Sequence, residues 1–408
     1  MSKIDKTRVI AVFNAFSGGF KASVDNCNIK RIGKGNIHTT YCLRNTETDQ
    51  KYIVQQLNTI FNIAAIDHNL QLFEQAQADA QSKGLIPSYW ERVSYLNVRK
   101  SSNKVYYDER GTAWRIMNFV PGEIQIFNSF SEMPLEDRED AAISLGEAIA
   151  NFRRMLGSVH IESWRKPLPN FHNLVYHLEY LDAILRYEEV VLNLSQDTSR
   201  KAKKQDTVIR KYPDGPNRID NLGRKIQERR NSISEFDELK SVIRHNDLFI
   251  NNAVFIKTKE TGNLECVCFI DLDTIQKGNE LGDLGNTLYS AGNPAGEEPE
   301  SINDVMIDKK TVINIIKGYL EKIAKFYGIE KVKLLKKYVF KTFQIAVYEE
   351  CIRYFADALV GNKYYRLEPD IPKDLNLYRA EVLMRVLEEL DKVLPELEKG
   401  LAKKFKNY

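Results

Sequence analysis

Hydrophobic and polar positions follow two different rhythms along this chain, and the change between them lies near residue 120. From residue 28 to about 115, short runs of β-prone side chains alternate with glycine and polar turns, as in Lys51–Gln56 and Val105–Tyr107. One stretch, residues 64–83, interrupts them with helical character. The first part of the chain therefore predicts a small sheet that carries a helix.

A proline and a glycine end the last of these strand-like runs. The run 114–120 is followed by Pro121 and Gly122. A strand stops there because proline offers no backbone donor and glycine favours a turn. We place a boundary after Asn118, which gives an N-terminal lobe of residues 1–118 and a C-terminal lobe of residues 119–408.

Beyond this boundary, apolar residues recur at helical spacing over most of the chain. The pattern predicts helices over 135–156, 173–194 and part of 217–240, and almost continuous helix from 309 to 408. Residues 195–216 are polar and strongly charged, which is typical of a solvated connection, with a basic binding arm as the alternative. The predicted fold class is α+β, with a small β-rich N-terminal lobe and a larger, mostly helical C-terminal lobe.

Two short apolar runs, 252–258 and 264–271, stand apart from the helical pattern. Turn-forming residues separate them, which favours a β-hairpin. Asp247 and Asn252 lie on the loop that enters this hairpin and Asp271 ends its return strand, so three oxygen-bearing side chains can converge. Phosphoryl transfer needs such a set, because one carboxylate must sit beside the acceptor hydroxyl while other oxygens hold magnesium on the phosphates.

Composition and charge limit the partners of this 408-residue chain. With 59 basic and 56 acidic residues, the net charge of +3 gives no nucleic-acid footprint and no polybasic membrane anchor. No apolar run reaches the roughly 18 residues of a membrane span, and the stretch 9–16 is short and broken by Asn14, which argues against a secretory signal. We expect a cytoplasmic protein that acts on a small molecule, without a nucleic-acid or membrane partner.

The catalytic-loop residues carry a resemblance to a known family. His245-x-Asp247-x-x-x-x-Asn252, followed by Phe269-Ile270-Asp271, resembles the catalytic and metal-binding signatures of aminoglycoside phosphotransferases and related choline and sugar kinases. The resemblance implies a bilobal protein-kinase-like fold that uses ATP and Mg²⁺. Asp247 would accept or orient the hydroxyl proton, Asn252 and Asp271 would ligate magnesium, and His245 would brace the catalytic loop.

Asp273 is a further acidic candidate on the same strand end. Because Asp271 and Asp273 share one face of an extended chain, Asp273 is either a second metal ligand or a carboxylate that contacts solvent and neighbouring backbone.

Nucleotide contacts are expected in and beside the first lobe. Gly33 and Gly35, with Asn36, form a turn that could bring backbone N–H groups close to phosphates, although an ordinary hairpin turn has the same sequence. Met117 and Phe119 lie where related kinases offer backbone groups to adenine, with a plain edge strand as the alternative.

The chain departs from the kinase pattern on the strand 51–56. Kinases of this superfamily usually carry there a Lys or Arg that grips the phosphates, whereas this chain has Gln55 and Gln56. Glu74, the expected partner of that cation, is left to face solvent or cap locally. The missing cation keeps a nucleotide-binding scaffold without activity as an alternative to an enzyme.

Several further patches are similar to N-acetylhexosamine 1-kinases. They are residues 16–18, 33–37, 52–58, 270–274 and 348–357, and they extend over most of the chain. This similarity implies that ATP phosphorylates the anomeric hydroxyl of N-acetylglucosamine or N-acetylgalactosamine. Another small alcohol, such as an aminoglycoside or choline, is the alternative acceptor.

A neutral sugar calls for hydrogen-bonding and stacking groups rather than a dense acidic pocket. The one acidic cluster, residues 294–304, is expected to be a solvated loop. Arg353 and Asp357, four positions apart on a predicted helix, form the candidate sugar-binding pair, with a surface salt bridge as the alternative. Asn36 is a weaker sugar candidate.

Overall fold

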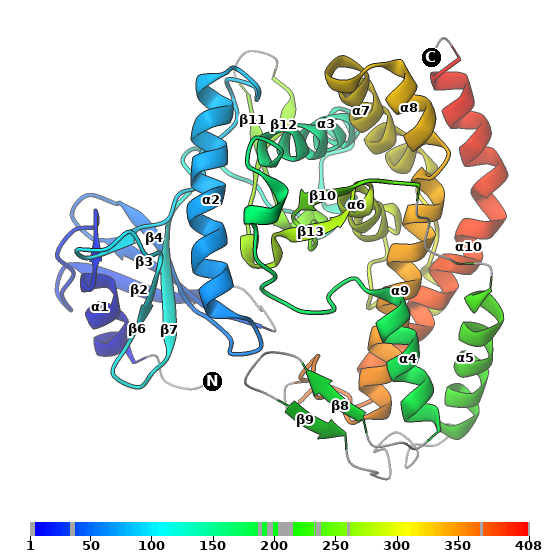
Figure 1. The fold of residues 1–408 in the computed structure, drawn as a ribbon, viewed down its shortest axis with the longest axis horizontal. Helices are drawn as coiled ribbons and strands as arrows, with labels where there is room; N and C mark the ends of the chain where they lie inside the picture. Colours follow the sequence, from blue (N-terminus) through cyan, green and yellow to red (C-terminus); the bar gives the residue numbers. More distant parts are fainter. Residues whose placement is uncertain are drawn as a thin grey trace.

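The computed structural model describes residues 5–32, 37–186, 190–193, 199–202, 215–231, 233, 238–258, 262–367 and 370–406. Figure 1 shows a β-rich part at one end of the molecule and a larger helical body at the other, with α2 (Ile63–Ser82) between them. The predicted α+β architecture of two lobes is therefore confirmed. Within the described residues, none of the helices combines the length and apolar character that a bilayer span requires.

The N-terminal lobe is built on a five-stranded antiparallel sheet in the order β2-β3-β4-β7-β6. The elements of this lobe besides α2 are α1 (Lys6–Asn14), β1 (Phe16–Ser17), β2 (Cys27–Ile32), β3 (Thr39–Asn45), β4 (Lys51–Gln56), β5 (Asn97–Val98), β6 (Val105–Tyr107) and β7 (Ala113–Asn118). The strands predicted at 51–56 and 105–107 and the helix predicted at 64–83 are confirmed.

The two faces of this sheet have different neighbours. Tyr52 and Val54 of β4 pack in the cluster that α1 completes, whereas Ile53 packs in the large core that includes α2. Successive side chains of a strand point to opposite faces. Gln55 and its direct partner Arg115 on β7 therefore share the face of Ile53, toward α2 and the C-terminal lobe.

The C-terminal lobe is mostly helical and carries three short strand pairs. Its elements are α3 (Arg138–Leu156), α4 (Leu174–Leu185), β8 (Val190–Asn193), β9 (Ser199–Ala202), α5 (Gly215–Arg230), β10 (Ser241–Arg244), β11 (Ala253–Lys257), β12 (Leu264–Phe269), β13 (Gln276–Asn279), α6 (Gly282–Gly292), α7 (Lys309–Tyr327), α8 (Ile329–Lys336), α9 (Val339–Leu359) and α10 (Leu375–Lys404). The hairpin predicted around residues 252–271 is confirmed as the antiparallel pair β11 and β12.

Two helix predictions extend too far. The helix predicted over 173–194 ends at Leu185, and 190–193 form β8, which pairs with β9. The solvated connection predicted at 195–216 lies largely outside the described residues. The long C-terminal helical pattern is interrupted after α9, because Gly361 and Asn362 adopt positive φ angles of 88° and 57°, which a right-handed helix does not accommodate.

Candidate active site

The predicted catalytic loop connects β10 to β11 and is held from behind by α6. Asp283, in the first turn of α6, accepts the backbone N–H groups of His245 and Asn246, each at 2.8 Å. The buried His245 ring uses Nε2 to contact the carbonyl of Ile270 at 2.8 Å. Because a carbonyl can only accept, the ring proton lies on Nε2. Nδ1 therefore accepts the N–H of Asp247. His245 is placed as a brace between the loop and the hairpin.

The loop is also held on the side that faces α9. His172 contacts the carbonyl of Asn246 through Nε2, and its Nδ1 lies 3.3 Å from Glu349 of α9. The imidazoles of His172 and His177 hold the pKa of the buried Glu349 carboxyl at about 2, although burial alone would raise it. Sequence reasoning missed this support, because these residues are far from the loop in sequence.

Asp247, Asn252 and Asp271 come together at the base of the hairpin. The Asn252 side chain donates from Nδ2 to the Asp247 carbonyl at 2.7 Å, and the Ile270 N–H donates to the Asn252 carbonyl at 2.9 Å. Asp271 follows directly, with a left-handed backbone (φ 62°) and a side chain that is 42% exposed. The three side chains predicted for chemistry are therefore neighbours in space.

The half-buried Asp247 carboxyl has a strongly altered acidity. Burial raises its pKa to about 7, and the charges of Asp271 and Glu350 add to this effect while Arg353 opposes it. A carboxylate whose pKa lies near neutrality is suited to take a proton from a hydroxyl group.

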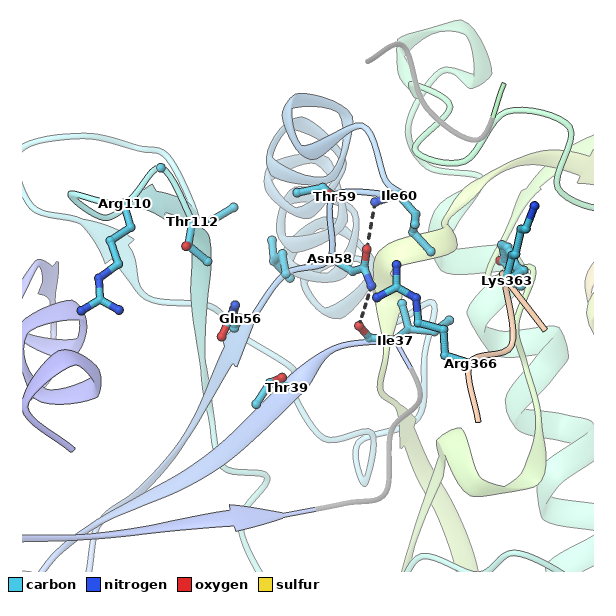
Figure 2. A pocket seen from close by; sticks show the side chains of 14 residues that line it. Ile37, Thr39, Gln56, Asn58, Thr59, Ile60, Arg110, Thr112, Lys363 and Arg366 are labelled. Atoms are coloured by element: carbon cyan, nitrogen blue, oxygen red, sulfur yellow. Dashed lines mark hydrogen bonds between the residues drawn. The ribbon is translucent and has the colours of Figure 1, made fainter. Parts of the chain in front are cut away.

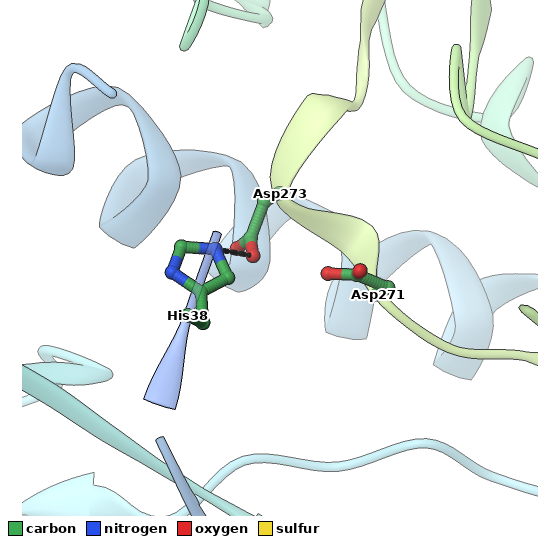
Figure 3. A group of neighbouring side chains, drawn as sticks. All are labelled: His38, Asp271 and Asp273. Carbon is green, nitrogen blue, oxygen red and sulfur yellow. Dashed lines mark ion pairs between the residues drawn. The ribbon is translucent and has the colours of Figure 1, made fainter. Parts of the chain in front are cut away.

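Asp273 makes a buried cluster with two residues of the other lobe, His38 (Figure 3) and Arg115. His38 donates from Nε2 to Asp273 at 2.7 Å, and both terminal nitrogens of Arg115 bind the same carboxylate, one of them at 2.8 Å. The Asp273 side chain is 2% exposed, and although burial alone would raise its pKa, Arg115 and His38 hold that pKa well below its usual value. Asp273 is therefore an ion-pair partner, which corrects the prediction of a solvent-facing carboxylate.

The group His38, Asp271 and Asp273 has the donor atoms of a metal site, but only Asp271 is open. The N–H of Asn58 donates to His38 Nδ1 at 3.0 Å, so the ring proton lies on Nε2 and is given to Asp273. The oxygens that remain available to a metal ion are those of the Asp271 carboxylate and the Asn252 amide. Carboxylate and amide oxygens are ligands that magnesium prefers, so these two residues fit that ion.

A cation lies beside Gln55 on the neighbouring strand, but both of its terminal nitrogens bind Asp273, so it does not take the place of the missing phosphate-binding Lys or Arg. Arg115 of β7 donates from Nε to Gln55 Oε1 at 2.9 Å, and its Nη2 lies 4.0 Å from Asp271. The sequence carries a signal for this residue, because Arg115 is the one charged residue within the apolar run 113–117. All five side chains of this run are buried.

Glu74 has a different cation as its partner. It binds the Lys104 ammonium group and accepts the Tyr95 N–H at 2.7 Å. The expectation that Glu74 faces solvent or caps locally is therefore wrong, because the start of β6 brings Lys104 over α2.

Of the predicted nucleotide contacts, Gly33, Gly35 and Asn36 lie outside the described residues. Met117 is buried near the end of β7, where it pairs with Ile53 and forms a bridge to Tyr95. Phe119 follows the strand, half-buried, with the Lys51 ammonium group 5.5 Å from its ring centre. At Met117 the edge-strand alternative is wrong, because β4 lies on one side and the segment 94–96 bonds to the other side.

The predicted pair of Arg353 and Asp357 is replaced by two other interactions. Arg353 pairs with Glu350, one turn earlier on α9, and its guanidinium lies 5.5 Å from the ring centre of Tyr364. The Asp357 carboxylate accepts the backbone N–H groups of residues 363, 364 and 365 at 2.8 to 3.0 Å. Asp357 thus organises the segment after α9, because its short side chain satisfies three backbone donors there.

The acidic cluster 294–304 is not simply a solvated loop. Glu297 accepts hydrogen bonds from the hydroxyl groups of Tyr289 and Tyr354, and its charge contributes to the raised pKa of Asp247. Glu298 forms an ion pair with Arg379. The loop folds back over α6 and α9 because two buried tyrosine hydroxyls need acceptors.

Comparisons with known proteins agree with this geometry. The model of the phosphotransferase enzyme family (APH) matches residues 28–302. The chain is similar to the crystal structure of choline kinase from Cryptosporidium parvum Iowa II, with 13% identity, 98% and 99% of the two chains covered and a TM-score of 0.55.

Two further solved structures give lower scores. The Plasmodium vivax ethanolamine kinase has 13% identity, with 92% of this chain and 85% of that chain covered and a TM-score of 0.48. The GDP complex of wild-type aminoglycoside 2′-phosphotransferase-IIIa has 12% identity, with 99% and 100% covered and a TM-score of 0.48. Since the family model spans well over half of the sequence, this chain belongs to the phosphotransferase enzyme family.

Proposed function

We propose that this protein is an ATP-dependent kinase that phosphorylates the anomeric hydroxyl of an N-acetylhexosamine. The observation that carries the proposal is the convergence of Asp247, Asn252 and Asp271 at the base of the β11–β12 hairpin. Membership of a phosphotransferase family agrees with it. The choice of acceptor rests on the sequence similarity to N-acetylhexosamine 1-kinases and on the charges around Asp247.

We assign each of these residues one role in phosphoryl transfer. Asp247 would take the proton from the acceptor hydroxyl, and Asn252 and Asp271 would hold a magnesium ion. When bound, that ion would neutralise charge on the phosphate oxygens. Arg115 would fix the turn that carries Asp271, because it grips Asp273 two residues later and lies 4.0 Å from Asp271 itself.

An acceptor without positive charges suits the carboxylates near Asp247. Glu350 is already bound by Arg353 and by the Tyr365 hydroxyl, and Glu297 accepts from two tyrosine hydroxyls. A polycationic acceptor would need free carboxylates to replace the water it loses, whereas a sugar needs hydrogen-bonding groups and aromatic rings. The half-buried ring of Tyr365 would offer such an aromatic surface.

An inactive scaffold is the alternative to an enzyme. It is motivated by the missing cation at Gln55 and Gln56, which Arg115 does not replace because both of its terminal nitrogens bind Asp273. The presence of Asp247, Asn252 and Asp271 at the base of the hairpin argues against it. An enzyme is therefore the better-supported reading.

A product assay tests the proposal. The protein is incubated with Mg-ATP and a panel of N-acetylhexosamines, simple hexoses, choline and aminoglycosides, and the products are identified by phosphorus NMR. We expect a sugar 1-phosphate from an N-acetylhexosamine, and the Asp247→Asn variant serves as the control for contaminating kinases. Turnover of choline or an aminoglycoside alone would refute the sugar assignment, and nucleotide binding without any turnover would favour the scaffold.

A further inference from the structure

A pocket of about 500 Å³ lies where the two lobes meet (Figure 2). Its walls come from the connection between β4 and α2, from the turn between β6 and β7, and from the segment between α9 and α10. A volume of several hundred Å³ is in the range of small-molecule sites. None of the predicted substrate or metal residues lines it.

The charge of this pocket is positive. Lys363 and Arg366 enter from the segment that follows α9, and Arg110 stands at the far rim (Figure 2). The described residues that line the pocket include no carboxylate. Arg110 lies 3.9 Å from Asp5, but Lys363 and Arg366 take part in none of the ion pairs among the described residues. In the part of the chain that the structure describes, two cations that make no ion pair thus line one cavity.

The segment that carries these cations is fixed in place. Asp357 accepts the N–H groups of residues 363, 364 and 365, and the Asn376 side chain donates to the Tyr365 carbonyl at 2.9 Å. Asp357 is buried and Asn376 is fully buried. A site whose backbone is held before binding loses less entropy when a ligand arrives. The pocket is therefore preformed on this side.

Residues on two opposite walls of the pocket interact with the candidate reaction centre. Tyr364 lines the pocket, and the charge of Asp247 contributes to raising the pKa of its hydroxyl, after the larger effect of burial. On the opposite wall, Asn58 donates its N–H to His38, which binds Asp273. A molecule that places one group in the pocket could therefore present another to Asp247.

We propose that this pocket binds a phosphate or carboxylate group that the acceptor carries in addition to its reacting hydroxyl. Ammonium and guanidinium groups form their strongest hydrogen bonds with such anions. The side chains of Thr39, Gln56 and Asn58 add neutral polar groups to the lining. The cations come from the segment of the C-terminal lobe that also places Tyr364 and Tyr365 near Arg353, which assigns them to the acceptor rather than to the nucleotide.

The anion site is tested first without turnover, because the acceptor assignment rests on the proposed function. Binding of inorganic phosphate is measured by calorimetry in the wild-type protein and in the double variant Lys363→Ala/Arg366→Ala. The control is Lys399→Ala/Lys403→Ala, which removes two charges from exposed positions on α10. We expect the dissociation constant to rise about tenfold or more in the pocket variant, and to stay unchanged in the control.

Three results of this binding test would overturn the proposal. They are the absence of phosphate binding to the wild-type protein, an equal loss in both double variants, and displacement of phosphate by Mg-ADP. The last would show that the cations serve the nucleotide. Circular dichroism and thermal unfolding verify that each variant is folded.

A kinetic test then concerns the acceptor itself. KM is compared for an N-acetylhexosamine and for its 6-phosphate, in both the wild-type protein and the pocket variant. We expect the phosphorylated sugar to have the lower KM in the wild type and to lose this advantage in the variant. Equal effects on both sugars would overturn the acceptor assignment. If neither sugar turns over, the proposed function fails while the phosphate titration still decides whether the anion site exists.

Discussion

At the scale of single residues, the tasks proposed for Asp247 and Asp271 are separable. Asp247→Asn keeps the size of the side chain but removes the proposed base, so we expect kcat to fall by about 10² to 10⁴ with little change in the Mg-ATP dissociation constant. Asp271→Ala removes the proposed metal ligand and should weaken Mg-ATP binding about tenfold or more. Steady-state kinetics and calorimetry measure the two effects, and near-normal turnover of Asp247→Asn would contradict the assignment of the base.

The sequence predicted that these residues lie together because the candidate catalytic groups belong to one loop and one hairpin. Spacing along a single strand pair converts directly into proximity, as Asn252 and Asp271 show. Arg115 and His38 could not be found in this way, since they meet Asp273 only when the two lobes pack together. The same limit applies to Glu297, whose position depends on two tyrosines of α6 and α9.

At the scale of elements, the contact between α3 and α7 depends on two glycines. A Cβ atom on Gly146 would lie 2.0 Å from the carbonyl oxygen of Ile315, and one on Gly318 would lie 2.0 Å from that of Ile143. Both atoms belong to helix backbones, which cannot move aside as a side chain can. The glycines are therefore required by the closeness of the two helices, not by their backbone angles.

Gly146→Ala should therefore destabilise the protein although alanine is the better helix former. The gain in helix propensity is about 1 kcal/mol, whereas forcing two helix backbones apart costs about 3 kcal/mol, the upper end for overpacking, because neither backbone can move aside as a side chain can. We expect the free energy of unfolding to fall by about 2 kcal/mol, measured by guanidinium denaturation.

The matched control for this prediction is Gly400→Ala in α10. A Cβ atom there would meet only the Ile313 side chain at 3.6 Å, which is an ordinary contact. This variant should be neutral or more stable by up to about 1 kcal/mol. Equal behaviour of the two variants would show that the α3–α7 backbones do not constrain position 146.

Most elements were predictable from hydrophobic period, whereas their ends were not. The strand β4 is a short run of β-prone residues that are buried on both faces of the sheet, and the helix α2 carries apolar residues at helical spacing. The end of α9 depends on Gly361 and Asn362 together with the buried Asp357, which collects the freed backbone donors after the helix. Because tertiary contacts determine where this helix ends, the apolar pattern alone predicts that the helix continues.

At the scale of the whole molecule, buried polar contacts tie the two lobes together. Asn69 of α2 donates to the Ile275 carbonyl at 2.8 Å, and the Glu91 N–H donates to the Val267 carbonyl at 2.9 Å. The ion pair of Arg115 with Asp273 lies in the same interface and is almost inaccessible to solvent. It also stands two residues from Asp271, so the packing of the lobes and the position of a candidate metal ligand are linked.

This link predicts different outcomes for stability and for activity. Arg115→Met leaves the buried Asp273 with His38 as its remaining partner, and losing one side of a buried ion pair costs about 3 kcal/mol or more. Adding Asp273→Leu removes the unpaired charge, so the double variant should recover much of that loss in guanidinium denaturation. Its kcat should nevertheless stay low, because the turn that carries Asp271 is no longer held. The stability of Arg115→Met, Asp273→Leu and the double variant is compared. If the losses are strictly additive, the ion pair does not couple the lobes. Normal turnover of the double variant would show that Arg115 does not position Asp271.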